Sequence, residues 1–256
     1  MPPLTRDVLI TGATGTLGHR VVPEATAAGH QVRAMSRRSH VGYTGVHWSQ
    51  GDLLTGAGVD AAMDGIDVIV HCATQGTGDK DVASMKNLVA AARRAGVGHI
   101  VYVSIVGIDR IPLPYYKSKL RAERVLEDSG VGHTVLRATQ FHDLIKTIFS
   151  IQRFSPVLST LRGVRFQPIN TRDVAARLVE LIHAEPAGRV ADIGGPSVHT
   201  HADLGRMYLA ARGGRRPVVQ VPLPGRIVAG YRSGANLVPD NPVGTVGFAE
   251  YLTETE

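Results

Sequence analysis

The sequence has few of the residues that disulfides, thiolate metal sites and membrane spans require. Cys72 is the one cysteine among 256 residues, which excludes an intramolecular disulfide and a thiolate metal cluster. No apolar run approaches the roughly 20 residues that a bilayer-spanning helix needs. The opening MPPLTRD lacks a basic segment followed by an apolar one, so nothing marks it for secretion. We therefore expect a cytoplasmic protein without a membrane partner.

Positive charge is in excess but is not gathered in one place. The formal net charge is +6, and the arginines are spread along the whole chain, with close pairs only in SRRSH and GGRRP. Dispersed arginine without interleaved aromatic residues is typical of a solvated surface, so we expect no nucleic-acid partner.

The motif HTH (199–201) has no acidic or cysteine companion at metal-binding spacing, so no metal is expected. The expected oligomeric state is a monomer or a homodimer.

The first two thirds of the chain alternate short apolar runs with longer amphipathic ones. The runs expected to be strands are 7–11, 31–36, 67–73, 99–104 and 133–138, and the expected helices are about 16–29, 56–64, 80–95 and 114–129. The strands are almost continuously apolar, as strands covered on both faces should be. Strand–helix alternation then predicts an α/β fold with a Rossmann-type, doubly wound parallel sheet.

The pattern loosens after about residue 140. We expect helices at 139–150 and 201–212, a further helix capped by Asn170 or Thr171, and a strand at about 189–195. The prediction is one NAD(P)-binding domain over 1–256. Within it, segments 139–165 and 195–240 would contribute a small C-terminal lobe that closes over the substrate as a lid. The tail from Asn236 is expected to be loosely held.

A glycine-rich stretch follows the first expected strand and opens the first expected helix. Gly12, Gly15 and Gly18 have the spacing G-x-x-G-x-x-G. Glycines there permit a tight turn and close approach of the backbone to a pyrophosphate, and the helix N-terminus attracts the anion. The expected contacts of the loop are Gly12, Thr14, Gly15, Thr16, Leu17 and Gly18. Pro23, inside the expected helix, removes one helical hydrogen bond.

The end of the second expected strand indicates which dinucleotide binds. NAD-binding domains place a carboxylate there for the ribose hydroxyls, whereas this chain has Ser36, Arg37 and Arg38 and no carboxylate before Asp52. A hydroxyl and two guanidinium groups suit a 2′-phosphate. NADP(H) is therefore preferred over NAD(H), and the alternative is that these residues form an ordinary basic surface loop.

Several motifs together resemble the atypical branch of the short-chain dehydrogenase/reductase superfamily, the NmrA-like NAD(P)-binding proteins. The motifs are TGATGTLG (11–18), MSRR (35–38), GDL (51–53), HCAT (71–74), VSIVG (103–107), YYKSKLRAE (115–123) and LRATQF (136–141). The resemblance implies that Asp52 and Leu53 flank the adenine. It also implies that Ala73, Thr74, Ala138 and Thr139 line the cofactor site. Ala138 departs from the family, whose members usually carry proline there.

The same resemblance implies an acid/base set of Ser104, Tyr115 and Lys119. Tyr115 and Lys119 are four residues apart, which places them on one face of a helix. We expect the Lys119 ammonium to lower the pKa of the phenol and to bind the nicotinamide ribose, while Ser104 polarises the substrate carbonyl. Tyr116 points elsewhere around the helix and Lys117 is expected to be solvated. The alternative is a chance spacing in an exposed first helical turn.

Phe141, His142 and Ile145 are the expected substrate contacts, although their apolar neighbourhood could equally be core. The predicted function is an NADP(H)-dependent oxidoreductase that transfers a hydride to or from a small, largely apolar carbonyl, hydroxyl or quinone compound. Tyr115 would be its acid/base. The alternative is an NmrA-like redox sensor that binds NADP(H) without turnover. A sugar-nucleotide epimerase is a third hypothesis, disfavoured because such enzymes tend to have a larger C-terminal domain.

Overall fold

The computed structural model describes residues 5–38, 45–76 and 78–254, which divide into two compact units. The first unit consists of the described residues within 1–104, 114–136 and 174–190. The second consists of those within 105–113, 137–173 and 191–256. The second unit therefore includes both segments, 139–165 and 195–240, that were expected to form a smaller lobe.

The first unit is built on a seven-stranded sheet in the order β3-β2-β1-β4-β5-β6-β9. Its strands are β1 (Asp7–Thr11), β2 (Gln31–Ser36), β3 (His47–Gln50), β4 (Val68–His71), β5 (His99–Ile105), β6 (His133–Ala138) and β9 (Gly188–Arg189). Parallel pairing joins β1 to both β2 and β4, β2 to β3, β4 to β5, and β6 to β9. The predicted parallel sheet is thus confirmed, with β3 as an additional edge strand.

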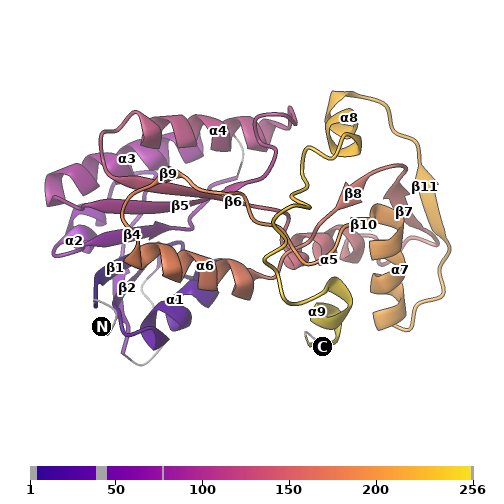
Figure 1. The fold of residues 1–256 in the computed structure, drawn as a ribbon, viewed down its shortest axis with the longest axis horizontal. Coiled ribbons are helices and arrows are strands. Elements are labelled where there is room, and N and C mark those ends of the chain that lie inside the picture. The colour runs from indigo at the N-terminus through magenta and orange to yellow at the C-terminus, as the bar shows by residue number, and fades with distance from the viewer. Residues whose placement is uncertain (1–4, 39–44, 77, 255–256) are drawn as a thin grey trace. The chain divides into compact units, whose positions relative to one another are not determined.

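Helices cover both faces of this sheet, as a doubly wound fold requires. They are α1 (Gly18–Ala27), α2 (Val59–Met63), α3 (Lys80–Ala95), α4 (Pro114–Glu127) and α6 (Thr171–His183). Figure 1 shows α3 and α4 on one face and α1 and α6 on the other. Met85 and Leu88 of α3 and Leu126 of α4 pack with Ile69 and Ile100 of the sheet in one hydrophobic core. Helix α1 runs through Pro23 without interruption.

The strand order reverses between β1 and β4, and this reversal locates the ligand-binding edge of the sheet. Chains that leave neighbouring strands in opposite directions open a crevice beyond the carboxyl ends of the strands, where open α/β sheets bind their ligands. The glycine loop follows β1, and the segment HCAT runs off the end of β4.

The second unit contains shorter elements around a separate hydrophobic core. They are α5 (His142–Ser150), β7 (Leu158–Leu161), β8 (Arg165–Phe166), β10 (His199–Thr200), α7 (His201–Ala211), β11 (Val218–Val221), α8 (Arg226–Arg232) and α9 (Phe248–Glu254). Phe149 and Leu158 are fully buried in this core together with Leu204. The strand expected at 189–195 is reduced to the two residues of β9 and an isolated bridge between Ala138 and Ile193.

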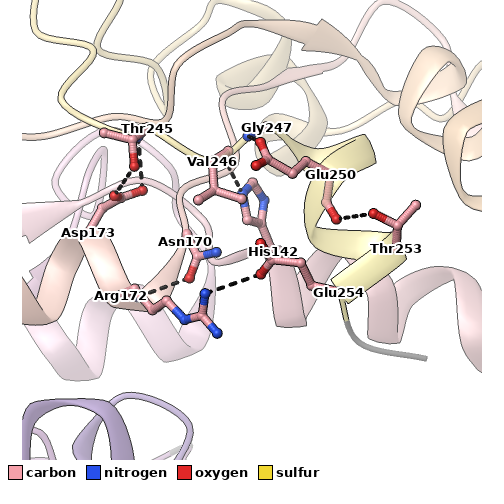
Figure 2. Close-up of polar contacts among 10 residues, drawn as sticks. All are labelled: His142, Asn170, Arg172, Asp173, Thr245, Val246, Gly247, Glu250, Thr253 and Glu254. Carbon is pink, nitrogen blue, oxygen red and sulfur yellow. Dashed lines mark hydrogen bonds and ion pairs between the residues drawn. The ribbon is translucent and has the colours of Figure 1, made fainter. Parts of the chain in front are cut away.

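The expectation of a loosely held tail from Asn236 is wrong. Asn236 is completely buried and donates from Nδ2 to Arg165 O at 2.9 Å. Figure 2 shows Thr245 bonded through its backbone N–H and its hydroxyl to the carboxylate of Asp173, at 3.1 and 2.7 Å. Helix α9 then buries Phe248 and Leu252 in the core of the second unit. Hydrogen bonds to residues more than 70 positions earlier hold this segment, and its local composition does not reveal them.

None of the helices in the described part of the chain is both long enough and apolar enough to cross a bilayer.

Candidate functional site

Two glycines of the loop after β1 are required by the packing of the first unit. Gly12 has φ +66°, and a Cβ on it would lie 2.7 Å from the Cα and N of Ala73. A Cβ on Gly18 would lie 2.2 Å from Gly12 O, because α1 begins directly against the loop. Any side chain at either position would force the backbone apart. Close packing of β1, β4 and α1 at the switch point therefore explains both glycines.

The middle of the same loop is open. Thr14, Gly15 and Thr16 are exposed, whereas the Leu17 side chain is buried in the core. Gly15 donates its N–H to Gly12 O at 2.9 Å and so closes the turn. The first turn of α1 continues directly from this loop, since His19 donates its N–H to Gly15 O at 3.1 Å. The arrangement suits a pyrophosphate, with Leu17 able to contribute its backbone rather than its side chain.

The end of β2 presents two guanidinium groups to solvent. Arg37 and Arg38 are exposed, and Ser36 is buried. The Ser36 hydroxyl donates to Arg38 O at 2.5 Å and accepts from Arg38 N at 3.2 Å, so it holds the turn that carries the arginines. Asp52 is turned into its own loop, where Oδ1 accepts from Leu54 N at 2.8 Å. Leu53 contributes its side chain to the core.

Helix α4 directs its polar residues to two different places. Tyr115, Ser118 and Arg121, at spacing three, contact the segment after β4: Tyr115 bonds Thr74, Ser118 donates to Gly78 O, and Arg121 pairs with Asp79. Lys119 and Glu123 are buried instead, and Lys117 is exposed. The helix begins at Pro114, whose fixed φ suits a first helical position. The predicted solvation of Lys117 is confirmed.

Lys119 is 4% exposed and is held by the end of β5. Its Nζ donates to Val103 O at 3.2 Å and lies 4.4 Å from the centre of the Tyr102 ring. Burial lowers the pKa of Lys119 to about 8, although the carboxylates of Asp81 and Glu123 act in the opposite direction. Lys119 is therefore a buried, hydrogen-bonded cation at the ligand-binding edge of the sheet.

The pKa of Tyr115 is shifted opposite to the expected direction. Burial raises it above the ordinary value, the hydrogen bond with Thr74 acts in the opposite direction, and the carboxylate of Asp81 and the neighbouring Tyr116 add to the increase. The expectation that Lys119 lowers this pKa is wrong, because burial dominates the shift and the Lys119 ammonium is bonded to Val103 O instead. Tyr115 is accordingly a protonated phenol, which is the form that donates a proton.

Ser104, next to Val103, has a buried hydroxyl that finds no hydrogen-bond partner among the residues the structure describes. A buried hydroxyl without a partner costs folding free energy, so its retention at the end of β5 favours a ligand atom as its partner. Ser104, Tyr115 and Lys119 all belong to the first unit. Their catalytic roles stay predictions.

The expected contacts beyond β5 lie in the second unit. Thr139 donates its hydroxyl to Gln167 O at 2.5 Å, and Ala138 O accepts from Val106 N. Ile145 is completely buried in the core of this unit, and Phe141 is half-buried. His142 is completely buried, and its Nε2 donates to Val246 O at 3.0 Å (Figure 2). Their cofactor and substrate roles stay predictions, and the burial of Ile145 and His142 favours the packing alternative.

The chain matches the family model described as NAD(P)H-binding over residues 12–185. The chain belongs to this NAD(P)H-binding family. The match covers the glycine loop, the end of β2 and the whole of α4. The NAD(P)-binding character that the sequence resemblance implied is thereby confirmed.

Three relatives illustrate the range of proteins that the chain resembles. The photosystem II assembly factor Ycf39 of Trieres chinensis is 27% identical over 182 residues, which are 66% of this chain and 57% of that protein. The (4-alkanoyl-5-oxo-2,5-dihydrofuran-3-yl)methyl phosphate reductase of Streptomyces griseus is 30% identical over 200 residues, 75% of this chain and 69% of that one. The NADPH complex of an Escherichia coli quinone oxidoreductase superposes with TM-score 0.82 at 22% identity, covering 96% of this chain and 99% of that one.

The first unit of this NAD(P)H-binding protein fits the cofactor of its family. Gly12 and Gly18 form a cradle that a Cβ would fill, Thr14 to Thr16 are open, and Ser104 offers a buried hydroxyl without a partner in the described residues. The glycine loop and the N-terminus of α1 would hold the pyrophosphate. Lys119 and Ser104 lie at the carboxyl end of β5, where the nicotinamide side of such a cofactor is expected.

Sequence reasoning missed Asp81. It is 6% exposed, lies in the first turn of α3, and accepts from Thr74 Oγ1 at 3.1 Å and from Gln75 N at 2.5 Å. Asp81 is therefore tied to the segment that carries the Tyr115 partner. The signal in the sequence was an acidic residue near the start of the helix after HCAT. Acidic residues are common there because they interact favourably with the helix dipole, so this one did not indicate a functional role.

Proposed function

We propose that the chain is an NADP(H)-dependent oxidoreductase in which Tyr115 exchanges a proton with a small, largely apolar carbonyl, hydroxyl or quinone compound. The observation that carries the proposal is the protonated Tyr115 phenol in the same unit as the glycine cradle, the buried Lys119 and the unpartnered Ser104 hydroxyl. When bound, a reduced nicotinamide supplies a hydride. The chain's own residues would orient the acceptor oxygen with Ser104 and protonate it from Tyr115.

An apolar substrate is supported by the second unit. Leu144, Ile151 and Phe154 of segment 139–165 expose their side chains, and Phe154 is 86% exposed. The other apolar residues of that segment, such as Phe149 and Leu158, are core. One structural relative solved with NADPH is a quinone oxidoreductase, which adds support for a quinone as the first substrate to test.

The turnover test compares Tyr115→Phe with the matched variant Tyr116→Phe, whose side chain is buried in the adjacent position. NADPH consumption is followed with a panel of quinones and ketones. Tyr115→Phe should lower kcat by about 10²- to 10⁴-fold because it removes the proton donor. Its NADPH affinity, measured by nicotinamide fluorescence, should stay within about threefold. Equal rates in wild type and Tyr115→Phe would contradict the acid/base assignment.

The preference for NADP(H) rests on the exposed Arg37 and Arg38 and on the lack of a carboxylate at positions 36–38. Arg37→Ala should weaken NADPH binding by about tenfold or more, as expected for the loss of a charge-assisted contact with a phosphate, and leave NADH binding unchanged. The exposed Arg93→Ala on α3 is the control for net charge. An equal change for both dinucleotides, or for neither, would refute the preference.

A second candidate is a redox sensor that binds NADP(H) without turnover. Two observations favour it: the Tyr115 hydroxyl is engaged by Thr74 within the protein, and one relative is a photosystem assembly factor. NADPH binding by wild type with no consumption in the presence of any quinone or ketone would support this candidate over the enzyme.

A further inference from the structure

A continuous chain of side-chain hydrogen bonds leads from the candidate proton donor to a buried carboxylate. Tyr115 Oη and Thr74 Oγ1 are 3.2 Å apart, and Thr74 Oγ1 lies 3.1 and 3.3 Å from the two carboxylate oxygens of Asp81. All three residues belong to the first unit. Asp81 is held in place by Gln75 N and by the first turn of α3.

The direction of this chain follows from the chemistry of its end. An ionised carboxylate only accepts hydrogen bonds, so Thr74 must give its single hydroxyl proton to Asp81. The bond between Thr74 and Tyr115 must then be donated by the phenol. With Asp81 ionised, Tyr115 therefore directs its proton away from the ligand-binding edge and offers a lone pair on that side.

We propose that Thr74 and Asp81 are positioning residues that hold the Tyr115 hydroxyl, so that Tyr115 Oη presents a lone pair to the ligand-binding edge of the sheet. This inference rests on the proposed oxidoreductase function and adds two positioning residues to it. Both residues act through Tyr115, and neither exchanges a proton with the substrate.

Asp81 interacts electrostatically with buried groups on two elements. Lys119 on α4 is a buried cation whose pKa Asp81 raises, against the larger effect of burial. Tyr115 on α4 and Tyr102 on β5 complete the surroundings, and Asp81 raises the pKa of both phenols, in addition to the effect of burial. Asp79, two positions earlier, contrasts with Asp81: its side chain is 79% exposed and pairs with Arg121. Asp79 therefore provides a matched control carboxylate.

The first experiment needs no turnover. The Tyr115 phenol is titrated through its tyrosinate absorbance, taken as the difference between each protein and the same protein carrying Tyr115→Phe. Asp81→Asn should lower the midpoint, because the negative charge that opposes phenolate formation is removed. Asp79→Asn should leave it unchanged. If Asp81→Asn and Asp79→Asn give the same midpoint, the coupling between Asp81 and Tyr115 is refuted, whether or not the protein is an enzyme.

The second experiment measures kcat and KM with NADPH and a quinone. Thr74→Val and Asp81→Asn should each lower kcat by about 10²-fold and leave KM for the quinone nearly unchanged. The double variant should be no slower than either single variant, because both break one chain. Thr74→Ser should restore the rate, and Asp79→Asn should match wild type.

The outcomes separate the positioning role from the proposed function. Rate losses that multiply in the double variant, or failure of Thr74→Ser to restore the rate, would overturn the positioning role while wild-type turnover still supports the enzyme. Absence of wild-type turnover would overturn the enzyme, and the shifted titration in Asp81→Asn would still establish the coupling between Asp81 and Tyr115. If Asp81→Asn does not fold, the comparison of Thr74→Val with Thr74→Ser decides the positioning role by itself.

Discussion

Acidification should destabilise the first unit through one buried histidine. His71, at the end of β4, is 3% exposed, shares a 2.7 Å hydrogen bond between its Nδ1 and Thr11 Oγ1, and stacks on Tyr102 with ring centres 5.2 Å apart. Burial, followed by the positive charge of Lys119, lowers the pKa of His71 to about 3. The folded protein therefore holds this ring neutral.

The size of the effect follows from linkage. The pKa of His71 is about 3 in the folded chain against 6.5 in the unfolded chain, so only the unfolded state takes up a proton between these values. The stability that the neutral ring contributes is complete above pH 6.5 and is lost as the pH falls towards 3. One histidine should remove about 2 kcal/mol by about pH 5, and the limit is about 5 kcal/mol.

The assay is urea unfolding at about pH 7.5 and about pH 5, with wild type, His71→Asn and His47→Asn in the same buffers. Asparagine at 71 cannot take up the proton. The decrease in unfolding free energy from about pH 7.5 to about pH 5 should therefore be about 2 kcal/mol smaller in His71→Asn than in wild type. His47 is exposed, and its replacement should leave the wild-type loss intact. Because each variant is compared with itself at the two pH values, any pH-independent effect of the substitution on the unfolding free energy cancels. An equal loss in wild type and His71→Asn would refute the reasoning.

Two further predictions concern the cradle and the C-terminal helix. The Cβ of Gly18→Ala would lie 2.2 Å from Gly12 O, so this variant should lose at least about 2 kcal/mol of unfolding free energy as well as NADPH binding. The Cβ of Gly15→Ala would lie 3.2 Å from the same oxygen, so this variant should keep the fold and lose NADPH affinity alone. Denaturant unfolding and fluorescence titration measure the two effects, and retained NADPH affinity in both variants would contradict the cradle. Phe248→Ala should lower the unfolding free energy by about 3 to 5 kcal/mol, whereas Phe154→Ala, at an exposed position, should change it little. A small effect of Phe248→Ala would mean that α9 is not part of the core.

Most of the fold of the first unit could be predicted from the sequence because its signals are local. Continuous apolar runs define strands buried on both faces, Pro114 marks the start of α4, and the glycine spacing after β1 predicts the cradle. The edge strand β3 escaped prediction because an edge strand is half-exposed and its sequence, HWSQ, has no apolar run. The strand expected at 189–195 shortened to two residues for a related reason, since few residues there find a neighbouring strand.

Contacts between residues far apart in the chain decided how the tail is held and what surrounds the candidate site residues. His142 was expected to contact the substrate, and only the fold shows that it is buried and bonded to Val246 O, 104 residues later. The tail is likewise held by Asp173. The spacing of Tyr115 and Lys119 suggested from the sequence that the two act as a pair, which stays a prediction. Only the tertiary structure shows that Lys119 is bound to Val103 O and that Tyr115 is bonded to Thr74. A pKa depends on burial and on every nearby charge, and those are set by the packing of β4, β5, α3 and α4 together.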